Sequence, residues 1–128
     1  MTPDLVLLAW TAALAVIQML VAVVGCLSQV GLAALAGNRE AMPERTGWAG
    51  RAERAHRNIL ESLPLFIAFV LIAHLARRTD PMTLLGEELF FAARLAYAVI
   101  YVVGIPWLRT VAWCLSVVGL LLIFVELL

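Results

Sequence analysis

The stretch that decides the fold lies at residues 51–76 and reads RAERAHRNILESLPLFIAFVLIAHLA. Its apolar part, residues 62–76, is too short to cross a bilayer as a helix, because a crossing takes about 20 residues. A spanning helix must therefore begin upstream and include Arg57, Asn58 and Glu61. Ionisable side chains at membrane depth are costly and usually mark a functional site. The stretch predicts a transmembrane helix with a polar site inside it.

The chain as a whole has the composition of a membrane protein. Of its 128 residues, 64% are hydrophobic and 14% are charged, and the mean hydropathy is +1.00. A soluble domain has about 45–50% apolar and about 25% charged residues. Nine basic and nine acidic side chains give no net charge, which argues against nucleic acid as a partner. Cys26 and Cys114 lack metal-ligand spacing, so we expect neither a disulfide framework nor a metal site.

Four apolar spans account for most of the chain. They lie at residues 5–38, about 57–76, about 82–103 and about 106–127. The first is longer than a bilayer requires, and its glycines at positions 25, 31 and 37 are candidates to bend or end the helix. We therefore predict one all-α domain over residues 1–128, an integral-membrane four-helix bundle.

The orientation in the membrane follows from the arginines, because cytoplasmic loops are enriched in basic residues. Six arginines lie on or beside the two connections that an antiparallel bundle places at one end: Arg39, Arg45, Arg51, Arg54, Arg57 and Arg109. Only Arg77 and Arg78 lie at the opposite end, with both chain termini. We therefore expect the arginine-rich end in the cytoplasm and the termini outside it.

Polar side chains repeat at helical spacing on one face of the second span and on one face of the third. They are Arg54, Asn58 and Glu61 in the second span, and Arg94, Tyr97 and Tyr101 in the third. Glu61 and Arg94 both lie about 15 Å below the cytoplasmic surface, so we expect a buried ion pair between them. Arg54 and Arg57 then lie near Tyr101 and Arg109, in a polar wedge that opens toward the cytoplasm.

The wedge favours a binding site over a purely structural role. A Glu–Arg pair alone is equally well explained as a device that fixes helix register. The additional arginines suit a small anionic ligand with more than one carboxylate. An arginine and phenol hydroxyls also suit the stabilisation of a thiolate, since a lowered thiol pKa generally requires a cationic neighbour.

Two motifs resemble those of the MAPEG family, the membrane-associated proteins in eicosanoid and glutathione metabolism. The first is Arg51-Ala-Glu-Arg-Ala-His-Arg-Asn-Ile-Leu-Glu-Ser-Leu-Pro64. The second is Ala93-Arg-Leu-Ala-Tyr97, followed by Tyr101, Gly104, Pro106 and Arg109. The chain is also similar to bacterial-type members in length and in its four-span layout, which implies the bacterial inner membrane.

The resemblance implies a homotrimer that holds glutathione between neighbouring subunits near the cytoplasmic face. The residues that match glutathione-binding positions are Arg54, Asn58, Glu61, Arg94, Tyr97 and Tyr101, and Arg57 of the same motif completes the expected set. Arg109 resembles the arginine that stabilises the thiolate, so Arg109 and Tyr101 are the candidate catalytic residues.

Three functions compete at this point. The first is a glutathione-dependent transferase or peroxidase that acts on lipophilic electrophiles entering from the lipid. The second is a non-catalytic membrane subunit or lipid-binding scaffold of the same fold. The third is a small multidrug antiporter, which needs a carboxylate in the first span; residues 5–38 contain none, which argues against it.

Overall fold

The computed structural model describes all 128 residues and contains four helices. In chain order they are α1 (Pro3–Ala36), α2 (Gly47–Leu75), α3 (Pro81–Val103) and α4 (Pro106–Leu127). The predicted all-α fold is confirmed, and α2 begins upstream of its apolar part. Three helices, α1, α2 and α4, are long and apolar enough to cross a membrane. Helix α3 has 23 residues and carries Glu87, Glu88 and Arg94.

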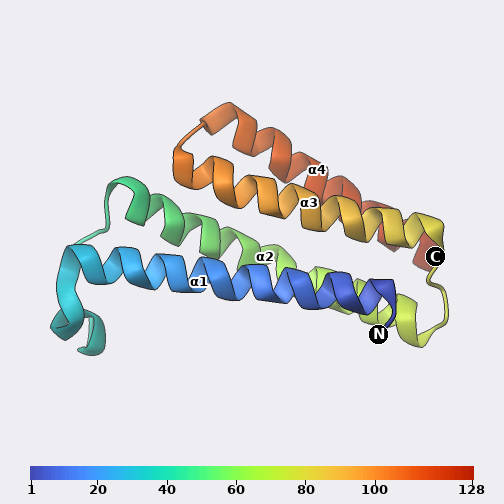
Figure 1. Cartoon of the computed structure of the whole chain (residues 1–128), viewed down its shortest axis with the longest axis horizontal. Helices are drawn as coiled ribbons and strands as arrows, with labels where there is room; N and C mark the ends of the chain where they lie inside the picture. Colours follow the sequence, from blue (N-terminus) through green and yellow to red (C-terminus); the bar gives the residue numbers. More distant parts are fainter.

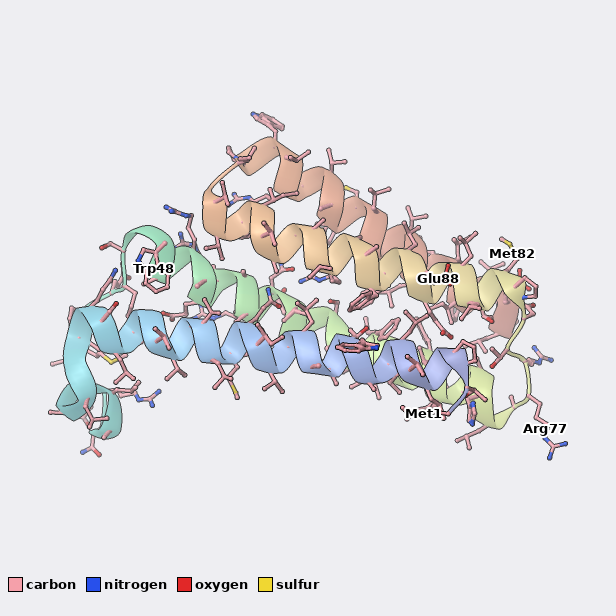
Figure 2. The ribbon with its side chains drawn as sticks, viewed as in Figure 1. Met1, Trp48, Arg77, Met82 and Glu88 are labelled. Atoms are coloured by element: carbon pink, nitrogen blue, oxygen red, sulfur yellow. The ribbon has the colours of Figure 1, made fainter.

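The helices lie side by side as two hairpins, α1 with α2 and α3 with α4 (Figure 1). Every pair of helices except α1 and α4 is in contact. Both chain termini lie at one end of the bundle (Figure 1). Figure 2 shows Met1, Arg77 and Met82 at this end and Trp48 at the other. The α1–α2 and α3–α4 connections therefore share the end opposite the termini, as an antiparallel bundle requires.

Glycines let the α3–α4 hairpin close tightly. A Cβ atom on Gly86 would lie 2.7 Å from the backbone oxygen of Gly119, and one on Gly119 would lie 2.6 Å from that of Gly86. Any larger residue at either position would push the helices apart. Small residues at helix crossings allow close packing in membranes, where the hydrophobic effect does not drive the association of helices.

A layer of aromatic and aliphatic side chains fills the middle of the bundle. The rings of Phe66 on α2 and Phe90 on α3 are stacked, with centroids 4.3 Å apart and an interplanar angle of 11°. Val70, Leu120 and Ile123 complete this cluster. The buried face of α3 carries Arg94 on one side of Phe90 along the helix and Glu87 on the other. The aromatic layer thus separates the buried polar side chains into two groups, one toward each end of the bundle.

Helix α1 breaks at Gly31, one of the three glycines expected to bend or end it. Gly31 has φ 81° and ψ 167°, a conformation that L side chains rarely adopt, and Gly37 follows the last helical residue. The connection to α2 is fixed by two reciprocal hydrogen bonds. The side chain of Gln29 donates to the carbonyl oxygen of Thr46 at 2.8 Å and accepts from the amide of Thr46 at 2.9 Å.

Candidate functional site

A buried arginine lies at the centre of the polar face between α2 and α3. Arg94 is 1% exposed, and its Nη2 donates a hydrogen bond of 2.8 Å to Oδ1 of Asn58. Its guanidinium carbon lies 4.5 Å from the ring centroid of Tyr97, close enough for a cation–π interaction. Nε and Nη1 of Arg94 are buried without a partner. These two nitrogens have no acceptor within the single chain.

The predicted Glu61–Arg94 ion pair is wrong for the single chain. The ion pairs of the structure do not include Glu61, whose side chain is exposed. The reason is angular, because residues three positions apart on a helix point about 60° apart. Asn58 faces α3 and takes the hydrogen bond of Arg94, whereas Glu61 lines a groove between α2 and α4.

Two arginines contact Tyr101, and both were predicted to lie near it. Nε of Arg54 on α2 donates to the phenol oxygen of Tyr101 at 3.1 Å. The guanidinium carbon of Arg109 on α4 lies 4.6 Å from the ring centroid of the same tyrosine. Tyr101 itself is 9% exposed and packs against Ala55 and Ala112. Side chains from α2 and α4 therefore converge on a phenol of α3.

Two hollows meet beside these side chains. The smaller, of about 170 Å³, is lined by Asn58, Tyr97, Arg109, Thr110 and Trp113. The larger, of about 480 Å³, lies between α2 and α4 and is mostly apolar: Asn58, Glu61, Ser62, Leu65, Phe69, Trp113, Ser116, Val117, Leu120, Leu121 and Phe124. Asn58 and Trp113 line both, so a cationic chamber adjoins an apolar groove at these two residues.

Arg57 lies outside this arrangement, in a polar cleft nearer the α1–α2 connection. The cleft measures about 310 Å³ and is lined by Glu44, Arg45, Gly50, Glu53, Arg54 and Arg57. Arg45 makes two hydrogen bonds of 2.6 Å to the carboxylate of Glu53, which raise the pKa of Arg45 above its usual value. Arg57 contacts the same carboxylate at 3.1 Å. Of the arginines in this cleft, Arg54 alone reaches Tyr101.

Sequence reasoning missed a second buried polar cluster, at the end of the bundle that holds the termini. Nδ1 of His74 lies 2.7 Å from Oδ2 of Asp4, a residue that the sequence placed outside the first span. Helix α1 begins at Pro3 and buries Asp4 to 1% exposure, and Glu87 is fully buried. No local pattern signals this cluster, because its members come from three helices. No group of three or more His, Cys, Asp or Glu side chains is placed to hold a metal ion.

Comparison with known proteins assigns the fold to a family. The model of the MAPEG family matches residues 6–128, which is nearly the whole chain. The chain belongs to the MAPEG family. No curated protein and no solved structure gives a significant match. Membership in the MAPEG family, together with the three long apolar helices, makes the chain an integral membrane protein with a MAPEG helical bundle.

Proposed function

We propose that this MAPEG protein is a glutathione-dependent transferase or peroxidase that acts on lipophilic electrophiles. The observation that carries the proposal is the convergence of Arg54 and Arg109 on Tyr101, beside the small chamber that Arg109 and Asn58 line. Clustered guanidinium groups with free donors suit a peptide that carries two carboxylates and a thiol. The MAPEG family is associated with glutathione in general, which points to that thiol.

The residues divide into a binding group and a group that acts on sulfur. The proposed glutathione-binding residues are Arg54, Arg57, Asn58, Glu61, Arg94, Tyr97 and Tyr101. We assign thiol activation to Arg109, because its cation lies over the Tyr101 ring and lines the small chamber. A cation beside a sulfur favours the thiolate, which is the nucleophile. The Tyr101 hydroxyl is the proposed hydrogen-bond donor to that sulfur.

The chemistry begins with loss of the thiol proton to solvent. In a transferase, the thiolate attacks an electrophilic carbon, a carbon–sulfur bond forms, and the leaving group departs with its electron pair. An epoxide takes the same attack, and its oxygen then accepts a proton. In a peroxidase, the thiolate attacks a hydroperoxide oxygen and releases an alcohol, and a second glutathione then displaces water to give the disulfide.

The apolar groove between α2 and α4 is the proposed route for the substrate. Leu65, Phe69 and Phe124 line its walls, and the groove reaches the chamber at Asn58 and Trp113. A lipophilic molecule that enters laterally would place its reactive end near the arginines. The same groove also suits a lipid that is held without reaction, which is the scaffold function.

The proposal includes an assembly and an orientation. A homotrimer would bring a second subunit against exposed side chains of the bundle, such as Glu61. The six arginines at the α1–α2 and α3–α4 end favour a cytoplasmic location for the site, in a bacterial inner membrane, with both termini outside the cytoplasm.

Direct glutathione binding by the detergent-purified protein tests the function. We expect saturable binding by calorimetry and, at neutral pH, the ultraviolet absorbance of a bound thiolate. S-methylglutathione, which keeps both carboxylates but has no ionisable thiol, is the matched control and should bind without that absorbance. Binding without thiolate absorbance or turnover would support a non-catalytic MAPEG subunit, and no binding at all would support the lipid scaffold.

A further inference from the structure

The fully buried carboxyl group of Glu87 has no hydrogen-bond partner. Both of its oxygens are unpaired and shielded from solvent, and its exposure is 0%. Glu87 lies on the buried face of α3, one helical turn after Thr83 and one before Phe90. Phe90, which stacks on Phe66, lies between Glu87 and Arg94 along α3, so Glu87 takes no part in the proposed thiol chemistry.

A second carboxyl group shares this end of the bundle with Glu87. Asp4 on α1 is 1% exposed, with Oδ2 held by His74 Nδ1 at 2.7 Å and by the Thr79 hydroxyl at 3.4 Å. Its other oxygen, Oδ1, is also buried and unpaired. Three carboxyl oxygens from two helices are thus unsatisfied in one region. Buried polar groups in folded proteins are nearly always paired, so the exceptions call for a missing partner.

No ion pair of the structure includes Glu87. The other titratable groups at this end come from every element around it: the N-terminal amine of Met1, Asp4 on α1, His74 on α2, Arg77, Arg78 and Asp80 in the α2–α3 connection, Glu88 on α3 and Glu126 on α4. Two other acidic residues, Asp4 and Glu88, lie near Glu87. His74 is engaged by Asp4, and Arg78 donates to the carbonyl oxygen of Leu127.

We propose that the Glu87 carboxyl is a proton-binding site, and that its proton keeps the first turns of α1 docked on α2 and α3. An unpaired carboxylate in a dry interior is far costlier than the neutral acid, and a nearby second carboxylate adds repulsion. A protonated Glu87 removes both costs. Loss of that proton places a second negative charge near Asp4, and the Asp4 end of α1 is the element that can move away.

Infrared difference spectroscopy of the full-length protein tests the proton directly. The neutral-pH spectrum of the wild type minus that of Glu87→Gln should contain the C=O stretching band of a protonated carboxylic acid. Glu88→Gln is the matched control, since Glu88 is the exposed neighbour on the same helix, and its difference spectrum should lack the band. If Glu87→Gln does not fold, Glu87→Met provides a second neutral variant of similar length. Absence of the band would overturn the proposal.

The docking of α1 has its own readout. Thr11 is fully buried two turns after Asp4 on the same face, so a Thr11→Cys thiol in a Cys26→Ala, Cys114→Ala background reports whether α1 is seated. The rate of maleimide labelling of this cysteine is measured in the protein that keeps Glu87 and in the Glu87→Gln variant. The ratio of the two rates cancels the pH dependence of the thiol itself. We expect a ratio near one at neutral pH that rises several-fold at alkaline pH. A ratio that stays at one throughout would contradict the docking role.

Discussion

Asn58 on α2 accepts a hydrogen bond from the buried Arg94 on α3, with 2.8 Å between Oδ1 and Nη2. Arg94 is buried, so this bond and the Tyr97 ring are its compensation for leaving water. The pair places a fixed positive charge at the boundary between the small chamber and the apolar groove, because Asn58 lines both.

Removal of the Asn58 amide should destabilise the bundle. Asn58→Leu leaves the Arg94 guanidinium without its acceptor, at a cost of about 1.5–3 kcal/mol for a hydrogen bond to a charged group. Asn58→Asp restores an acceptor of opposite charge and should recover most of that loss. Reversible unfolding in detergent measures the difference. Ser62→Ala, which removes only a local hydrogen bond to the Ile59 carbonyl, is the control, and equal losses in all three variants would contradict the pairing.

Arg109 and Arg54 should separate thiol activation from ligand binding. Arg109→Ala should leave glutathione affinity largely intact but abolish the thiolate absorbance and turnover. Arg54→Ala, which also removes the hydrogen bond to Tyr101, should mainly weaken binding. The comparison is informative because ground-state binding and transition-state stabilisation respond differently in KM and kcat. Full thiolate signal and turnover in Arg109→Ala would transfer the role to Tyr101, which Tyr101→Phe then tests.

Bulk at the glycine crossing of α3 and α4 should be poorly tolerated. Gly86→Ala and Gly119→Ala each place a Cβ atom within 2.7 Å of the opposite backbone. Overpacking of this kind costs about 1–3 kcal/mol, and the strain should also disturb Phe90, which lies 2.8 Å from the Gly119 Cβ position. The midpoint of thermal unfolding in detergent should fall in both variants. Ala96→Leu adds bulk to the exposed face of α3, and a fall of similar size there would remove the steric explanation.

The N-cap of α3 should lose its contribution in acid. The side chain of Asp80 accepts hydrogen bonds from the amides of Thr83 and Met82 at 2.8 and 2.9 Å, and these bonds hold the pKa of Asp80 below its usual range. The stabilisation is therefore present above the pKa of an unfolded aspartate and disappears as the pH falls through the lower, folded value. Unfolding midpoints measured between neutral and acid pH should fall more steeply for wild type than for Asp80→Asn, which caps without titrating. Parallel curves would assign the acid sensitivity to other groups.

Orientation can be tested with cysteines at the two ends of the bundle, in the Cys26→Ala, Cys114→Ala background. The exposed Ala41 in the α1–α2 connection is suitable for one of them. Ala41→Cys should resist membrane-impermeant thiol reagents in intact cells, and Met82→Cys, 42% exposed at the other end, should react (Figure 2). The reverse pattern would put the proposed site on the outer side of the membrane.

Periodicity and hydropathy are local properties, so the sequence alone was enough to predict four helices and the faces that carry polar residues. The requirement that α2 extend back through Asn58 and Arg57 followed from bilayer thickness. The contact of Arg54 with Tyr101 followed from counting depth along two antiparallel helices, and the structure confirms it. Gly31 was a candidate for a bend in the first helix for a similar local reason, its lack of a Cβ atom.

Only the tertiary structure decided which side chain on a face meets which partner. Glu61 and Arg94 lie at equal depth in the membrane, which predicted that they pair. The rotation of α2 about its own axis instead places Asn58 against Arg94 and turns Glu61 toward α4. Asp4, His74 and Glu87 lie far apart along the chain, and their meeting depends on how three helices pack. The helical repeat in the sequence shows only which face of a helix a side chain lies on. Whether that side chain forms a hydrogen bond or buries its charge depends on its distance and angle to a partner, which the packing of the whole bundle sets.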